Sequence, residues 1–250
     1  MQICKFAHSH IRKFAHSHIR TSSSIIFASL QNPIPHIINK HTFWITPQRC
    51  CWWEEENALI LSDLHLGKSG HFRKEGISVP QGIYRADLQR LIAQLFYFKA
   101  DRLIIVGDFT HSKANRELDH FLKWRNDFPS LEIDLVKGNH DILADSWYRD
   151  AGITVFDENL LVGDFCFRHD LDSKGCNDVP AHTAYTFVGH VHPGITVRGK
   201  GRQALHFPCF YFAKTHCILP AFSRFTGTFS VEQKKNETVY AIADDQLLRI

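Results

Sequence analysis

Five short polar clusters in the sequence each follow an apolar run, and together they carry side chains that suit metal binding. They are Asp63-Leu-His65, Gly107-Asp108, Gly138-Asn139-His140-Asp141, Arg168-His169 and Gly189-His190-Val-His192. Two Asp, one Asn and several His form a ligand set for two hard or borderline divalent cations. Five such clusters in series indicate a metal-dependent enzyme that acts on phosphate esters.

The spacing within two of these clusters predicts how their ligands are shared. Asp63 and His65 are two residues apart at the end of a strand, so both can face one metal. His190 and His192 repeat this spacing and can divide between the two metals. Two cations about 3.5–4 Å apart acidify a bridging water and clamp the phosphoryl oxygens, which is what phosphodiester hydrolysis requires.

The middle of the series supplies the other predicted ligands. Two cations held close together need a bridging anion, and Asp108 is the candidate because it directly follows a buried strand. Gly107 allows the backbone to approach closely there. Asn139 offers a neutral amide oxygen, and His169 completes the second metal site.

His140 and Asp141 follow a predicted ligand without being assigned as ligands themselves. His140 is the candidate catalytic acid, which stabilises developing charge or protonates the leaving oxygen. Two roles are open for Asp141. It either orients a neighbouring group from behind the ligands or caps a helix that starts near Ile142.

The elements that carry these clusters can be read from the apolar pattern. Strands are predicted at 58–61, 102–106 and 133–136, and helices after Pro80 and around Leu118–Arg125. A hairpin is expected where 160–162 and 165–167 flank Gly163-Asp164. The C-terminal third, with strand-like runs at 205–212, 216–219, 228–231 and 239–242, predicts a second sheet packed face to face on the first.

Charge and cysteine usage restrict the class of protein. The net charge is +3, but residues 1–53 contain six basic and no acidic residues, so the remainder of the chain is slightly acidic. This remainder therefore has no general excess of positive charge that would indicate nucleic acid binding. The seven Cys include no C-x-x-C pair, which is typical of reduced thiols, and a cytoplasmic location is expected. No apolar run is long enough for a membrane span.

The first 35 residues are expected to form a poorly ordered basic extension, and residues 36–250 a single catalytic domain. Residues 5–12 and 13–20 are identical copies of Lys-Phe-Ala-His-Ser-His-Ile-Arg. Two short copies cannot build a stacked core. The stretch also loosely resembles an organelle transit peptide.

The five clusters resemble the motifs of the calcineurin-like metallophosphoesterase superfamily, which read D-x-H, G-D, G-N-H-[DE], a lone H and G-H-x-H. The resemblance implies an α/β fold, a four-layer α/β/β/α sandwich of two mixed sheets flanked by helices. It also implies a dinuclear site in which His140 is the catalytic acid. The first metal would be held by Asp63, His65, Asp108 and His192, and the second by Asp108, Asn139, His169 and His190.

A closer resemblance is to the bacterial DNA ligase-associated metallophosphoesterases. It rests on 63–68, Phe72-Arg73, 76–80, 107–112, 189–193, 219–222 and 225–227. It implies a manganese-dependent phosphodiesterase or endonuclease of DNA repair, acting on single-stranded or damaged DNA in association with a DNA ligase and a helicase. Iron, zinc and nickel are the alternative metals. The chain departs from this family at Arg168-His169-Asp170, where Ser-His-Glu-Pro is usual, and at Phe109-Thr110.

Lys68, Arg73 and His111 are the candidate substrate-binding residues, since cationic and imidazole groups suit a phosphate. Two other functions are considered. A nucleotide-lipid pyrophosphatase shares the Asp-Leu-His-Leu start, but that family typically has Arg at the position of His140. A non-catalytic scaffold with the same fold would tend to lose ligands or the catalytic His, and this chain keeps all of them.

Overall fold

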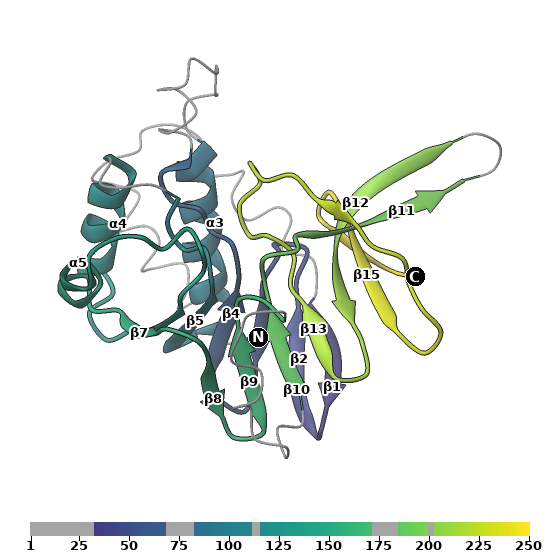
Figure 1. The fold of residues 1–250 in the computed structure, drawn as a ribbon, viewed down its shortest axis with the longest axis horizontal. Coiled ribbons are helices and arrows are strands. Elements are labelled where there is room, and N and C mark those ends of the chain that lie inside the picture. The colour runs from purple at the N-terminus through teal and green to yellow at the C-terminus, as the bar shows by residue number, and fades with distance from the viewer. Residues whose placement is uncertain (1–32, 69–82, 112–115, 172–184, 200–202) are drawn as a thin grey trace, which may run out of the picture. The chain divides into compact units, whose positions relative to one another are not determined.

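The computed structural model describes residues 33–68, 83–111, 116–171, 185–199 and 203–250. The described elements form two β-sheets and three helices, labelled as in Figure 1. The two parts of the sandwich are built largely from successive parts of the chain. The first sheet and the helices come from residues before 157, and the second sheet comes from residues after 159.

The first sheet has seven strands in sequence order. They are β1 (Ile34–Ile38), β2 (His41–Ile45), β3 (Cys51–Trp53), β4 (Ala58–Leu61), β5 (Arg102–Val106), β6 (Glu132–Val136) and β7 (Thr154–Phe156). Strands β1 to β4 pair antiparallel, and β4 to β7 pair parallel. The three strands predicted at 58–61, 102–106 and 133–136 therefore form its parallel centre, and their carboxyl ends meet at one edge.

The second sheet has nine strands, in the order β14-β11-β12-β13-β10-β9-β8, with β15 paired to β12 and β16 paired to β15. They are β8 (Leu160–Val162), β9 (Phe165–Arg168), β10 (Tyr185–Val188), β11 (Pro193–Arg198), β12 (Ala204–Phe212), β13 (His216–Ile218), β14 (Phe229–Ser230), β15 (Thr238–Ala243) and β16 (Gln246–Arg249). The predicted hairpin is the antiparallel pair β8–β9, in which Val162 lies opposite Phe165.

The helices are α3 (Ile83–Phe98), α4 (Arg116–Asn126) and α5 (Asp145–Asp150), and all three cover the first sheet (Figure 1). Leu88, Leu91 and Leu95 of α3 are buried against that sheet and Ile92 is partly buried, which is the spacing of one face of a helix. None of the described helices is long and apolar enough to cross a membrane.

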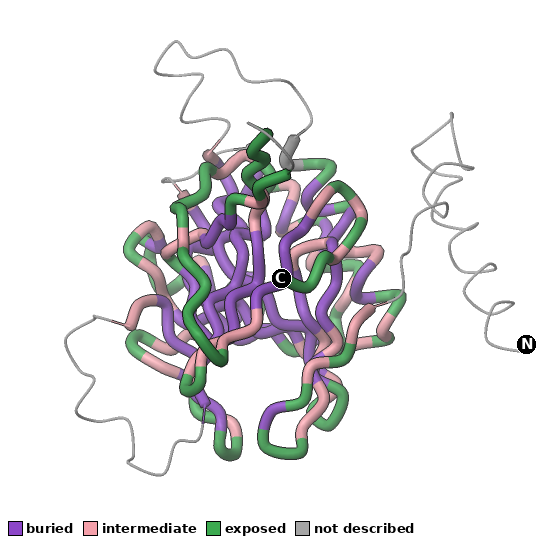
Figure 2. The backbone as a smooth tube through the Cα atoms, turned by 90° about the vertical axis from the view of Figure 1, so that its right-hand side faces the viewer, coloured by how far each residue is buried: buried purple, intermediate pink, exposed green. Residues whose placement is uncertain are grey.

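The main core lies between the two sheets, where Phe43, Phe165, Phe187 and Phe210 are fully buried. Alternate residues of β4 and β5 face this core and the helices, so both faces of the central strands are covered. Figure 2 shows the buried residues concentrated in the central strands and the exposed ones in the loops. The five cysteines in the described residues are buried.

The expected α/β fold with two mixed sheets is confirmed. Among the described residues its layers are helices, first sheet and second sheet, and no helix from these residues covers the outer face of the second sheet. The segment that joins β9 to β10, residues 172–184, lies outside the described residues.

Candidate metal centre

All five polar clusters lie just after strands, and strands of both sheets contribute. The clusters of the first sheet follow β4, β5 and β6, and those of the second sheet follow β9 and β10. Backbone hydrogen bonds join the two sheets here, since Phe222 N, after β13 of the second sheet, donates to Ser62 O, after β4 of the first sheet. Within the second sheet, Gly189 N donates to His169 O and Leu219 N donates to Val188 O. The carboxyl ends of both sheets therefore meet around one site.

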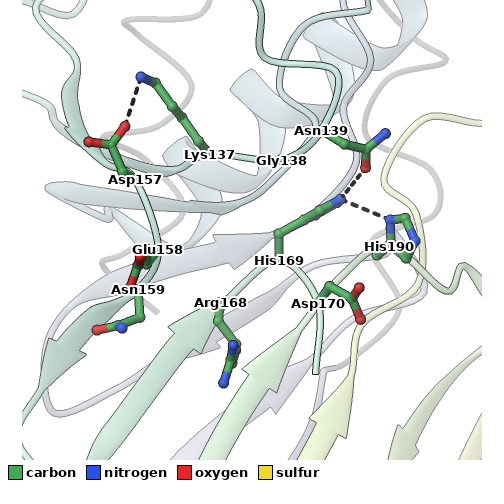
Figure 3. A pocket seen from close by; sticks show the side chains of 10 residues that line it. All are labelled: Lys137, Gly138, Asn139, Asp157, Glu158, Asn159, Arg168, His169, Asp170 and His190. Carbon is green, nitrogen blue, oxygen red and sulfur yellow. Dashed lines mark hydrogen bonds and ion pairs between the residues drawn. The ribbon is translucent and has the colours of Figure 1, made fainter. Parts of the chain in front are cut away.

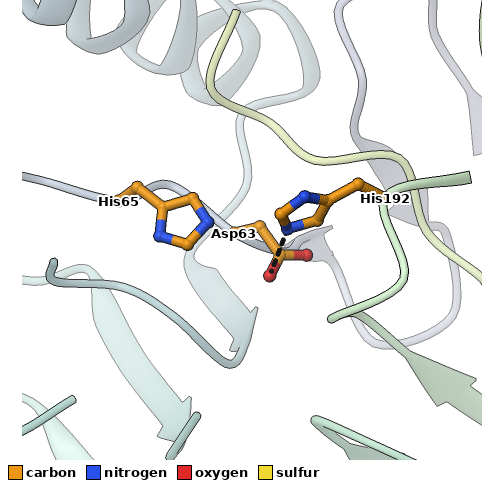
Figure 4. Close-up of side chains that lie close together, drawn as sticks. All are labelled: Asp63, His65 and His192. Atoms are coloured by element: carbon orange, nitrogen blue, oxygen red, sulfur yellow. Dashed lines mark ion pairs between the residues drawn. The ribbon is translucent and has the colours of Figure 1, made fainter. Parts of the chain in front are cut away.

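Asp63, His65 and His192 form the first group of potential ligands. One ligand atom from each lies within 4.8 Å of the others. The Asp63 Oδ1 atom is 3.2 Å from His192 Nε2, and the Asp63 residue is fully buried. Figure 4 shows the rings of His65 and His192 on either side of the Asp63 carboxylate.

Asp108, His169 and His190 form the second group, and Asn139 joins it. His169 Nε2 lies 3.0 Å from His190 Nδ1 and 3.1 Å from Asn139 Oδ1. Figure 3 shows these three side chains turned toward one another. Atoms with lone pairs thus converge from three separate loops, as expected of ligands around a cation.

Asp108 lies between the two groups. Its Oδ2 atom is 3.9 Å from His65 Nε2 of the first group, and its Oδ1 atom is 3.5 Å from His169 Nε2 of the second. One oxygen of this buried carboxylate thus faces each group. This is the arrangement needed for a carboxylate that bridges two cations.

The residues of the site fit divalent cations. Both ring nitrogens of His65 are buried and have no hydrogen-bond partner within the described part of the chain. Burial, and then the positive charge of Lys68, lowers the pKa of His65 to about 2. His65 therefore stays neutral and keeps a free lone pair, which is the form that binds a metal. Two carboxylates, four imidazoles and one amide oxygen suit manganese, iron, zinc or nickel.

Five of the candidate ligands have left-handed backbone conformations, which non-glycine residues rarely adopt. These residues, with φ from 46° to 63°, are Asp63, His65, Asp108, His190 and His192. Each such residue costs roughly 1–2 kcal/mol relative to the right-handed region. Strain of this kind concentrates at functional sites, because the surrounding structure must hold it in place.

This strain predicts that glycine at position 192 is more stable than alanine. Both His192→Gly and His192→Ala remove the imidazole, but only glycine adopts a φ of 50° without steric cost. We expect the metal-free glycine variant to be more stable by about 1 kcal/mol in urea unfolding. An alanine variant of equal or greater stability would show that the backbone at this position is not strained.

Glycines allow the close approach of these loops. A Cβ atom on Gly107 would collide with the His169 ring, and one on Gly138 would collide with the carboxylate and backbone nitrogen of Asp108. A Cβ atom on Gly189 would lie 2.6 Å from the Val106 carbonyl oxygen. The role predicted for Gly107 is therefore confirmed, and Gly138 and Gly189 act in the same way.

Asp141 braces two of the ligand loops. Its buried carboxylate accepts hydrogen bonds from the backbone N–H groups of Gly138 and Thr110, at 2.9 and 2.8 Å, and from the Thr110 hydroxyl at 3.1 Å. The alternative helix-capping role is wrong, because α5 starts at Asp145 and its N-cap residue is Ala144. Asp141 instead ties the loop after β5 to the loop after β6.

This brace leads to a prediction for Asp141→Asn. The amide keeps the shape of the carboxylate but presents one N–H₂ group to backbone donors, so the two loops are held less firmly. Groups behind metal ligands typically change metal affinity by about 10–100-fold when replaced, and we expect a loss in that range. Calorimetric metal titration measures it, and wild-type affinity would contradict the role.

His140 lies beside Asp108 at the edge of the site. Its backbone N–H donates to Asp108 Oδ1 at 3.0 Å, its Nε2 atom is 4.0 Å from Asp108 Oδ2, and its side chain is 40 % exposed. The His111 ring lies against it, with ring centroids 4.5 Å apart. An exposed imidazole next to a convergent ligand set can reach a bound substrate.

The three candidate substrate residues lie differently with respect to the site. His111 contacts the rings of both His65 and His140. Lys68 is partly exposed, and its ammonium is near enough to Asp63 and Asp108 for their charges to raise its pKa, although burial lowers it more. Arg73 lies outside the described residues.

A cavity of about 460 Å³ opens beside the second group and was not predicted from the sequence. It is lined by Lys137, Gly138, Asn139, Asp157, Glu158, Asn159, Arg168, His169, Asp170 and His190 (Figure 3). Lys137 Nζ lies 2.9 Å from Oδ1 of Asp157, another lining residue, and 3.0 Å from Oδ1 of Asp145 on α5. Five of these residues belong to the predicted polar clusters, but no sequence signal marked Lys137, Asp157, Glu158 or Asn159, because the loop after β7 carries no metal-ligand pattern.

Comparison with known proteins agrees with this geometry. A family model described as calcineurin-like phosphoesterase matches residues 57–189. The solved structure of the Pseudomonas putida nuclease MPE is 28% identical, covers 87% of this chain and 100% of that chain, and superposes with a TM-score of 0.72. The Aquifex aeolicus protein AQ665, of unknown function, is 18% identical over 58% of this chain and 82% of its own, with a TM-score of 0.38.

No curated protein matches the sequence. The family model nevertheless spans more than half of the chain, from the residue before β4 to Gly189 after β10. The solved structure and the paired ligand groups agree with it. The chain belongs to the calcineurin-like phosphoesterase family and is a metal-dependent phosphoesterase.

Proposed function

We propose that this protein is a dinuclear phosphodiesterase that cleaves DNA in a repair pathway. In this proposal Asp63, His65, Asp108 and His192 hold the first cation, and Asp108, Asn139, His169 and His190 hold the second. The observation that carries the proposal is the position of Asp108, with one carboxylate oxygen facing each ligand group. Manganese is the proposed metal.

When bound, two such cations would supply an activated water and neutralise charge on the phosphoryl oxygens. The residues of the chain provide the other requirements of the reaction. Asp63 and Asp108 add negative charge that balances the cations, and the neutral imidazoles and amide complete the ligand set without adding more. Gly107, Gly138 and Gly189 let the ligand loops converge, because a side chain at any of these positions would collide with a neighbouring loop.

In the proposed mechanism His140 protonates the oxygen that leaves. Its exposed imidazole lies at the edge of the site, and its backbone is fixed by the hydrogen bond to Asp108. His111, whose ring lies against that of His140, and Lys68 would contact the substrate phosphate, together with Arg73. Lys68 would act as a point charge and Arg73 as a two-donor fork.

Two observations support DNA as the substrate. The similar Pseudomonas putida protein is a nuclease by name, and this chain covers its whole length. The cavity beside the second group is in the size range of ligand pockets and has room for a sugar and base next to the scissile phosphate. The proposal also includes action on single-stranded or damaged DNA, functional association with a DNA ligase and a helicase, and a cytoplasmic location. It further includes an extension formed by residues 1–35 ahead of one catalytic domain.

The test is a substrate panel on the metal-reconstituted protein. Single-stranded, nicked and duplex DNA, cyclic nucleotides, nucleotide-lipid mimics and bis(p-nitrophenyl) phosphate are compared with manganese, iron, zinc, nickel or EDTA. We expect manganese-dependent cleavage of single-stranded DNA that EDTA abolishes. Preference for the nucleotide-lipid mimic would identify a pyrophosphatase instead. No turnover with any metal would favour a scaffold.

A further inference from the structure

A short segment after β13 runs beside the start of the first ligand cluster. Phe222 N donates to Ser62 O at 2.8 Å, and Ser223 N donates to Asp63 O at 3.2 Å. Ser62 and Ala221 form an isolated parallel bridge, and the Ser62 hydroxyl donates to Pro220 O. The backbone of Asp63 is therefore fixed by residues 220–223, which belong to the other end of the chain.

Residues 220–223 are held in turn by two arginines, Arg90 and Arg49. Arg90, on α3, donates to the Phe222 carbonyl and lies over the Phe222 ring, with 4.2 Å from its guanidinium carbon to the ring centroid. Arg49, in the turn between β2 and β3, donates to Ala221 O at 3.3 Å and to Ser223 O at 3.0 Å. Three successive carbonyls of the segment thus accept hydrogen bonds from guanidinium groups.

A buried carboxylate completes this cluster. Asp87, one turn before Arg90 on α3, lies 3.0 Å from Arg90 Nη2 and accepts hydrogen bonds from the Ser223 side chain and the Arg224 backbone. Asp87 is 3 % exposed and Arg90 is 8 % exposed. Buried ion pairs carry a large desolvation cost and are weak evidence of a stabilising role, so a different role is worth testing.

We propose that Arg90 and Asp87 are positioning residues for the first metal site and act through residues 220–223 on Asp63. This inference rests on the proposed role of Asp63 as a metal ligand. Asp63 is fully buried and its φ is 54°, so its backbone must be held in a conformation that it would otherwise leave. The guanidinium–carbonyl bonds supply that constraint, since a planar guanidinium with several donors fixes direction as well as distance.

The experiment replaces Arg90 by methionine, which keeps most of the buried stem and removes the donors. Isothermal titration with manganese measures the two binding steps of the intact protein. We expect one of the two affinities to fall by about 10–100-fold and the other to stay within a few-fold of wild type. Excess manganese should restore most of the lost turnover if the loss comes from weaker metal binding. It would not restore turnover lost through a purely structural defect.

Arg125→Met is the matched control. Arg125 also donates to three backbone carbonyls, those of Ala151, Leu131 and Phe128, but these support α4 and the loops around β6 and α5 and carry no candidate ligand. We expect a lowered melting temperature in both variants and weakened metal binding only in Arg90→Met. If Arg90→Met does not fold, Arg90→Lys gives the same comparison, because it keeps the charge and loses the planar fork.

The outcomes separate this inference from the proposed function. Two wild-type affinities in Arg90→Met, with only a lowered melting temperature, would overturn the positioning role and leave the dinuclear proposal standing. Equal weakening in the Arg125→Met control would also overturn it, because the effect would then be general. A wild-type protein that binds no manganese would overturn the proposed function and this inference with it.

Discussion

Replacing Asp108 by asparagine is expected to remove both metals and to lower turnover by at least about 10³-fold. This loss exceeds the effect of removing one hydrogen-bond donor to the transition state, because both cations would be lost. The side chain keeps its shape, but it loses the charge and one of the two oxygens that face the ligand groups at 3.9 and 3.5 Å. Metal content after dialysis and hydrolysis of bis(p-nitrophenyl) phosphate are the measurements.

Asp134→Asn provides the matched control for this variant. Asp134, on β6 of the first sheet, is also buried, but its carboxylate lies 2.6 Å from the guanidinium of Arg102 on β5. It belongs to neither ligand group. We expect this control to lose stability and keep both metals. If Asp108→Asn retained both metals at wild-type affinity, the bridging assignment would be wrong.

The second large effect is expected for His140→Ala. Loss of a general acid typically slows proton transfer by about 10²–10⁴-fold, and we expect a loss in this range for DNA, whose leaving group is a poor alkoxide. The loss should be much smaller with bis(p-nitrophenyl) phosphate, since nitrophenolate leaves as a stable anion and needs little protonation. Single-turnover rates on the two substrates measure the difference.

Metal content and a second histidine control the interpretation of this variant. The imidazole of His140 belongs to neither ligand group, so the variant should bind two metals. His206→Ala removes an exposed histidine on β12 that bonds only Thr196 and Thr228 among the described hydrogen bonds, and it should leave both rates unchanged. Equal losses on the two substrates, or loss of a metal, would exclude a role as proton donor.

Much of this site was predicted from the sequence because its ligands follow local rules. Each cluster directly follows an apolar strand, and the carboxyl ends of neighbouring strands meet at one edge. The structure brings together Asp63, His65 and His192 in one group and Asp108, Asn139, His169 and His190 in another. The roles of these residues as ligands, and of His140 as the acid, stay predictions until metals and rates are measured.

Asp141 shows where local patterns stop being informative. An aspartate before an apolar stretch fits a helix cap and a hydrogen-bonding brace equally well, so the sequence left both roles open. The structure excludes the cap, because its carboxylate points to the backbone of Thr110, in the loop of another strand. Such a partner is 31 residues away, and no local pattern carries it.

The sequence by itself determined the residue types of the site, the strands that carry them and the α/β class of the fold, because these depend on hydrophobic periodicity and on the spacing of side chains along the chain. The tertiary structure alone decided which oxygen of Asp108 faces which group, which ligands take left-handed backbone conformations, and that Arg90 and Asp87 lie behind Asp63. These features depend on contacts between segments far apart in the sequence, and the contact of Arg90 with Phe222 joins residues 132 positions apart. Packing of the two sheets fixes those contacts, and no local sequence pattern encodes them.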